Sequence, residues 1–225
     1  ELIESDPLEA YATDVCRQVV QRIAPALTGR RAAWLQEDYL VFAVTDGAAT
    51  DAAGTLAAHG RDIAQLLRGE RQPLSQEECD EVLRHRLSYL ADDLVVPSWN
   101  AAFVLDTPAA AEAALEWFEY VNSQLLEFRY HDELLEAELS RIYADLQQPR
   151  RLDRWTGWRH RRAARRLQAL FIDVNELADR VENAVKFTGD PWAARLVGLT
   201  AARVRLDGWR VNVQEKLRTL DGDLH

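Results

Sequence analysis

The longest regular pattern in this sequence is an amphipathic stretch over residues 108–148. It has no glycine or proline after Pro108, so one helix of about 40 residues, roughly 60 Å long, is expected. Apolar residues recur seven positions apart in two series, which is typical of a coiled-coil seam. The first series is Phe118, Leu125, Leu139 and Leu146, with Asp132 in the remaining slot, and the second is Val121, Phe128, Leu135 and Ile142.

The residues before this helix alternate between helical and strand patterns. Asp6 and Pro7 form a helix start, Gly29 a helix stop, and Ser75 opens a capping box with Glu78. The expected elements are helices over 7–28 and 52–68, a helix from residue 76, and strands at 39–44, 94–96 and 99–105. The first 107 residues therefore predict a small mixed α/β domain.

The residues after the long helix have a helical pattern only. A second long helix is expected over 159–187, and a third over 191–220 after the Gly189-Asp190-Pro191 break. The third places Leu199, Leu206 and Val213 seven residues apart. The predicted fold is α+β and predominantly helical, with an α/β domain at 1–107 and a long antiparallel three-helix bundle at 108–225.

The composition of the chain argues against two functional classes, bulk nucleic-acid binding and membrane spanning. The formal net charge of −10 argues against bulk binding of nucleic acid, and the longest apolar runs fall short of a membrane span. Cys16 and Cys79 are isolated, so both are expected to be small buried hydrophobes rather than disulfide partners or metal ligands. Because the 225 residues contain no methionine, even at position 1, the chain is expected to start inside a longer gene product or to have had its start removed.

One segment, 150–166, departs from the acidic character of the chain. It has eight arginines and one aspartate, a formal charge of +7, with Trp155 and Trp158 interleaved. Such a segment can bind RNA, a ribosome or another polyanion, or an anionic membrane surface, or it can pair with acidic neighbours at a corner of the bundle. The candidate polyanion-binding residues are Arg150, Arg151, Arg154, Arg159, Arg161, Arg162, Arg165 and Arg166.

A second candidate site is the polar centre of the long helix. Glu127 and His131 are four residues apart and share a helix face, a spacing that can supply two metal ligands. The alternative is a polar layer inside the bundle, in which a buried Asp132 needs a partner. Arg129 or an arginine of the next helix is the simplest partner.

The sequence has no nucleophile elbow, phosphate-binding loop or dinucleotide fingerprint. No catalytic residue, cofactor, metal or small-molecule substrate is therefore predicted. The expected function is that of a non-enzymatic scaffold or interaction module that self-associates through its long helices. RNA or ribosome binding through 150–166 is the alternative, and a metal-dependent hydrolase a weaker one.

Parts of the sequence resemble a group of bacterial membrane-anchored proteins related to the "required for meiotic nuclear division" family. The segments that carry the likeness are 87–106, 122–135, 180–195 and 209–217. The resemblance implies a membrane-spanning segment soon after Leu220 and a cytoplasmic location at the inner membrane. It implies no catalytic residue.

Overall fold

The computed structural model describes residues 6–27, 35–45, 51–147, 169, 172–176, 179, 183 and 189–223. The chain divides into two compact units, Glu1–Leu35 and Gln36–His225. The first contains helix α1 (Asp6–Ile23) and a 3₁₀ turn, Ala24–Ala26. The predicted helix ends earlier than Gly29 because Pro25 lacks a backbone N–H and disfavours the α conformation before it. Cys16 is exposed, contrary to the prediction, since Val20 is the buried side chain among those described on α1.

The second unit contains a three-stranded sheet in the order β1-β3-β2. β1 (Leu40–Val44) lies parallel to β3 (Ala101–Leu105), and β2 (Leu94–Pro97) pairs antiparallel with β3. Pro97 is tolerated because β2 is an edge strand. The three predicted strands are confirmed, but β3 begins after Trp99 because the Ser98 N–H bonds the Ala101 carbonyl in a turn, at 2.7 Å.

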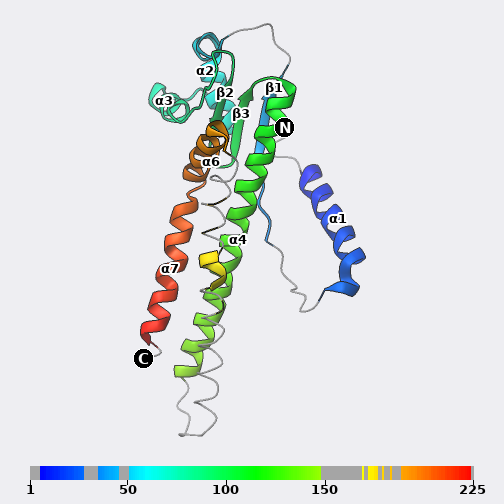
Figure 1. Cartoon of the computed structure of the whole chain (residues 1–225), viewed down its shortest axis with the longest axis vertical. Helices are drawn as coiled ribbons and strands as arrows, with labels where there is room; N and C mark the ends of the chain where they lie inside the picture. Colours follow the sequence, from blue (N-terminus) through cyan, green and yellow to red (C-terminus); the bar gives the residue numbers. More distant parts are fainter. Residues whose placement is uncertain are drawn as a thin grey trace. The chain divides into compact units, whose positions relative to one another are not determined.

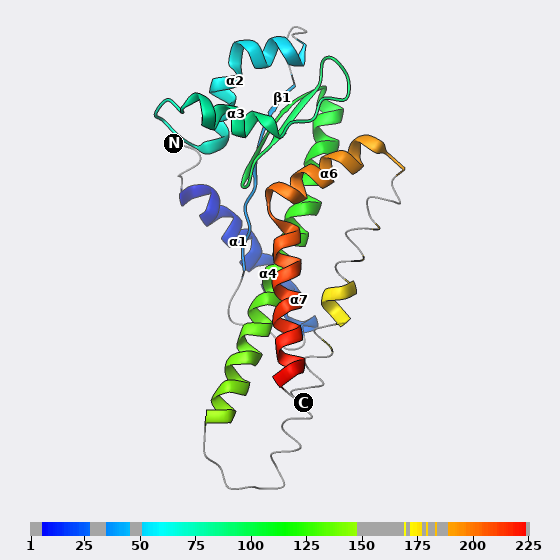
Figure 2. The ribbon, with the colours of Figure 1, turned by 90° about the vertical axis from the view of Figure 1, so that its left-hand side faces the viewer.

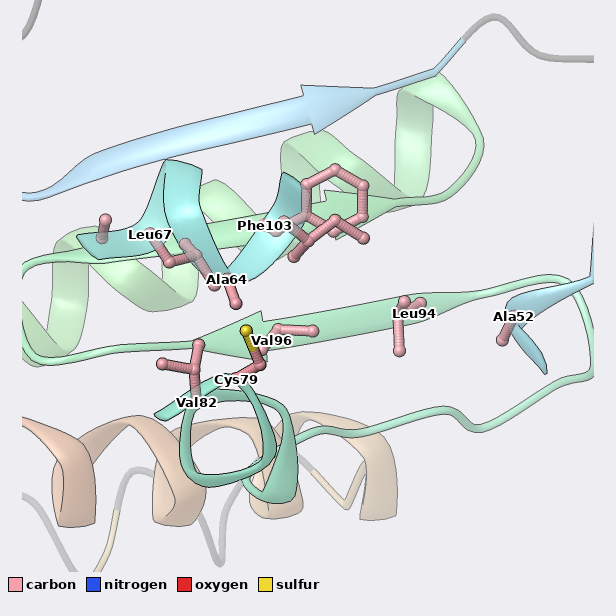
Figure 3. Packing of buried hydrophobic residues seen from close by; sticks show 10 residues of the cluster. Ala52, Ala64, Leu67, Cys79, Val82, Leu94, Val96 and Phe103 are labelled. Carbon is pink, nitrogen blue, oxygen red and sulfur yellow. The ribbon is translucent and has the colours of Figure 1, made fainter. Parts of the chain in front are cut away.

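Helices cover both faces of this sheet. One face packs against α2 (Ala52–Arg68) and α3 (Gln76–Arg84) in an entirely apolar cluster (Figure 3). That cluster takes Leu94, Val96 and Phe103 from the strands. The intervening residues Val95 and Val104 belong to a second cluster, with α4 and α6. Strict alternation therefore buries both faces of short apolar strands.

The longest helix, α4 (Pro108–Gln147), is confirmed (Figure 1). The Thr107 hydroxyl caps it by accepting a bond from the Ala110 N–H at 3.3 Å. All the predicted seam positions whose side chains are described are buried, namely Phe118, Val121, Leu125, Phe128 and Leu135. Beyond the sheet α4 lies beside α7 (Leu206–Asp223), as Figures 1 and 2 both show.

The predicted last helix is interrupted. Asp190 caps α6 (Pro191–Arg203), and α7 begins at Leu206. Between them Arg205 has a left-handed backbone with φ 56°, although the sequence offers no glycine or proline at this point. The break lets Val204 and Leu206 both enter the core.

The fold is thus α+β and predominantly helical. Val174 is buried in the same cluster as Val121, Val197 and Val213, but most of the predicted helix 159–187 lies outside the described residues. The three-helix bundle and the domain division at residue 107 therefore stay predictions. None of the helices that the structure describes is long and apolar enough to cross a membrane.

Candidate functional site

Of the two sites predicted from the sequence, one lies outside the described residues and the other is described. The eight arginines of 150–166 all lie outside the described residues, so their prediction stays untested. The polar centre of α4 is described, and its four residues do not form one site. Arg129 forms an ion pair with Glu37, which precedes β1 and is 15% exposed. Glu127 is exposed.

Asp132 is held by a residue that the sequence did not suggest. Lys216 of α7 donates to Asp132 Oδ1 at 2.7 Å and to Glu136 Oε2 at 3.0 Å. Burial lowers the pKa of Lys216, but the hydrogen bonds and charges of the two carboxylates outweigh it and raise that pKa above its ordinary value. Of the two predicted partners, Arg129 pairs with Glu37 instead. The arginines of the predicted next helix lie outside the described residues, so that alternative stays a prediction. The lysine comes from α7, which lies beside α4.

His131 is partly buried, and its Nδ1 has no hydrogen-bond partner among the described residues. Burial lowers its pKa, against the opposing charges of Asp173 and Glu127. The described residues contain no group of three His, Cys, Asp or Glu side chains that could hold a metal ion. Within the polar centre, Arg129 and Asp132 therefore pair with different elements of the structure, Glu37 before β1 and Lys216 of α7.

The structure instead brings together a pocket that the sequence did not predict. It has a volume of about 770 Å³ and lies where the end of β2, the start of β1, α4 and the α6–α7 junction meet. We call it the junction pocket. Its charged lining consists of Arg68, Arg129, Arg203, Arg205, Glu37, Asp38 and Glu81, and its other polar or aromatic lining of Trp99, Asn100, Asn122 and Trp209.

Ion pairs fix three of the four arginines. Arg68 donates through Nε to Glu78 at 2.7 Å, and Arg129 pairs with Glu37. Arg203 is 18% exposed, and its Nη1 lies 3.8 Å from Glu81. A guanidinium has five N–H donors, so one carboxylate partner orients it and leaves donors for a ligand. The Arg203 Nε is buried and has no hydrogen-bond partner among the described residues.

Tyr39 holds the backbone of the β2–β3 turn, which carries Trp99 and Asn100. Its hydroxyl donates to the carbonyls of Ser98 (3.1 Å) and Ala101 (2.9 Å). Burial raises the pKa of Tyr39 well above its ordinary value, so the ring stays neutral and keeps this proton. Trp99 is 60% exposed at the rim, on a turn whose backbone is thereby held in place.

The sequence did not predict this pocket, because its lining residues are scattered between positions 37 and 209 and its four arginines belong to no recognisable sequence motif. Arg129 alone was singled out, as a partner for Asp132. The one usable signal was the charge of Arg203 and Arg205 at either side of Val204. In an unbroken helix, two arginines at these positions are expected to be ordinary charged side chains that face solvent.

Comparisons with known proteins place this chain near an uncharacterised group. Residues 1–112 match the family described as the N-terminal domain of uncharacterized protein MJ0711. The uncharacterized protein MJ0711 of Methanocaldococcus jannaschii is 20% identical over 158 residues, which cover 70% of this chain and 48% of that protein. The chain thus spans about half of this relative's length. No solved structure matches.

These matches overturn the resemblance to bacterial relatives of the "required for meiotic nuclear division" family. They point to an archaeal MJ0711 family instead. The expected membrane anchor after Leu220 came from that resemblance and loses its support. The matched residues 1–112 include Arg68, Glu81 and Trp99, so six of the fourteen residues that line the junction pocket lie in the region that resembles this family.

Proposed function

We propose that this chain is a non-enzymatic interaction module that self-associates through its long helices. The observation that supports it is the length of α4, which at about 1.5 Å per residue far exceeds strands of four or five residues. In its second half, Phe128 and Leu135 belong to a core cluster with side chains of α6 and α7. In this proposal α4, a helix over 159–187 and the α6–α7 pair form an antiparallel three-helix bundle.

Partly apolar groups on that surface support association between copies. Tyr130 is 40% exposed on α4, and Val211 is 46% exposed on α7. Large apolar groups exposed along neighbouring helices are common in helix–helix interfaces between copies of one chain. The acidic charge of the chain disfavours close approach at low salt, so association is expected to strengthen as salt screens it.

Light scattering coupled to size-exclusion chromatography tests this proposal. A dimer is expected at tens of micromolar, and its dissociation constant should rise at least tenfold in Tyr130→Glu. Tyr89→Glu is the matched control, since Tyr89 is 55% exposed in the α3–β2 connection and away from the long helices. A monomer at high micromolar concentration would remove self-association.

The second candidate function is binding of RNA or a ribosome through 150–166. Its support is the charge of +7 in a chain whose net charge is −10. Single-stranded RNA and vesicles containing anionic lipid are the two probes, before and after changing Arg161, Arg162, Arg165 and Arg166 to alanine. Loss of RNA binding alone favours RNA, loss of vesicle binding alone favours an anionic membrane surface, and no binding by the unaltered chain ends the candidate.

A further inference from the structure

The junction pocket has the dimensions of a ligand site. Its volume of about 770 Å³ lies within the range of pockets that bury a small organic molecule. It is open in a part of the molecule that is otherwise well packed, with Leu125 and Val204 buried in its lining. The pocket is open to solvent and its lining is mostly polar, so water fills it in the absence of a ligand.

The charges of the lining favour an anion. Four arginines face three acidic side chains there, in a chain whose net charge is −10. Two of the acids, Glu37 and Glu81, are engaged with Arg129 and Arg203. These pairs orient the guanidinium groups and leave further N–H donors on each of them.

Arg203 presents the most specific signal. Its buried Nε has no hydrogen-bond partner among the described residues, and an unsatisfied buried donor is costly. Nε and a terminal nitrogen of a guanidinium form a fork that matches two oxygens of a carboxylate or phosphate. A bound oxyanion would satisfy the donor.

Arg205 adds a second, independent signal. It has the one positive φ among the described non-glycine residues, at 56°, and it lines the pocket. Left-handed backbone is unfavourable for residues with a Cβ and persists where the surrounding structure holds it, here the buried Val204 and Leu206, and such positions are concentrated at ligand sites. The strain therefore marks the same corner of the pocket as the unpartnered Arg203 Nε.

The tryptophans supply a surface for the rest of a ligand. Trp99 is 60% exposed at the rim, and Trp209 lines the pocket while packing against the core. Exposed tryptophan beside arginine is well suited to contact a flat or apolar group. We propose that the junction pocket binds a small organic anion, with Arg203 and Arg205 holding its phosphate or carboxylate group and Trp99 and Trp209 contacting its body.

Isothermal titration of the full chain with four probes tests the chemistry of the ligand. Phenyl phosphate and benzoate carry an anionic group on a ring, inorganic phosphate lacks the ring, and benzyl alcohol lacks the charge. We expect at least one ring-bearing anion to bind about tenfold or more tightly than benzyl alcohol and inorganic phosphate. Preference for phenyl phosphate assigns a phosphate ligand, and preference for benzoate a carboxylate ligand.

Variants then locate the binding. Arg205→Gly removes the side chain and suits the left-handed backbone, so the fold is retained while affinity falls about tenfold. Arg203→Gln and Trp99→Ala are expected to weaken binding similarly. Arg195→Gln is the matched control, since Arg195 is exposed on α6 and does not line the pocket.

Two results would overturn the proposal. One is an absence of heat with every anion at millimolar concentration. The other is an Arg205→Gly variant that binds the preferred anion as tightly as Arg195→Gln does. Neither result bears on self-association, which is measured without a ligand.

Discussion

Two of the helices that the structure describes, α2 and α6, are followed by a residue with a left-handed backbone, and the amino acid differs between them. α2 ends at Gly69, with φ 63°, and α6 is followed by Arg205, with φ 56°. Glycine adopts this conformation without a steric cost, whereas arginine adopts it at a cost of about 1–2 kcal/mol. Gly69 adopts this conformation freely, whereas Arg205 is held in it between Val204 and Leu206, which are both buried, and its side chain lines the junction pocket.

The same contrast runs through the two sides of the sheet. The side under α2 and α3 buries apolar side chains, including Leu67 and Cys79 at 1% and 2% exposed. The side formed with α4, α6 and α7 also has an apolar core, but charged residues surround it. Arg203 of α6 lies 3.8 Å from Glu81 of α3, where the two sides meet, and Lys216 of α7 pairs with Asp132 of α4. Both sides are therefore expected to contribute to stability through their apolar clusters, and binding is expected where the charged residues gather.

The largest expected loss of stability comes from a substitution in the apolar core under α2 and α3. Leu67→Ala should lower the free energy of unfolding by about 3 kcal/mol, because it removes a fully buried side chain and leaves a cavity. Leu66→Ala is the matched control on the same helix, since Leu66 is 37% exposed and should cost well under half as much. Urea denaturation measures both, and equal losses would contradict the assigned packing of α2.

A smaller effect is expected at the lysine between α4 and α7. Lys216→Gln leaves Asp132, 17% exposed, without its cationic partner and should cost about 1–3 kcal/mol at pH 7. Arg84→Gln breaks the exposed Arg84–Glu81 pair and should cost about 0.5 kcal/mol or less. A Lys216→Gln loss no larger than that of the control would mean that this contact adds no stability.

The pH dependence of this contact has a definite sign. The pKa of Lys216 is raised in the folded state, so its contribution is complete below the unfolded pKa, near 10.4. The contribution is lost as the pH rises through the raised pKa. The stability difference between the unaltered chain and Lys216→Gln should therefore be constant from pH 7 to about 9 and shrink above about 10.5.

The two left-handed positions can be compared by adding a Cβ at Gly69 and removing the side chain of Arg205. Gly69→Ala should lower the free energy of unfolding by about 1 kcal/mol, and the cost is conformational because a Cβ there meets no atom within 4 Å. Arg205→Gly should leave stability unchanged or raise it by about 1 kcal/mol. Thermal unfolding measures both, and a marked loss in Arg205→Gly would assign its side chain a role in stability.

The smallest expected effect concerns His131. Burial lowers its pKa, so the unfolded chain takes up its proton more readily than the folded chain does. Stability should therefore fall as the pH drops from 7 through the ordinary histidine pKa, near 6.5, towards the lowered one. His131→Gln should reduce that fall in a series of unfolding measurements between pH 7 and 5, and an unchanged slope would place the titrating group elsewhere.

The sequence by itself determined the elements whose signals are local. The start of α3 followed from its Ser75 cap, and the predicted helix 52–68 coincides with α2. The seam of α4 followed from apolar spacing, which predicts which face is buried. Apolar strands of four or five residues were also readable, because a sheet covered on both faces needs continuous apolar runs.

Only the tertiary structure decided the partners. Lys216 and Asp132 are 84 positions apart in the sequence, and Arg129 and Glu37 are 92 apart. The spacing of residues along the chain cannot predict pairs that are so far apart. The break at Arg205 was equally invisible, since no breaking residue marks it and packing of Val204 and Leu206 overrides local helix propensity. The junction pocket depends on the Arg129–Glu37 pair and on the break at Arg205, because its lining comes from several elements that meet only in the tertiary structure.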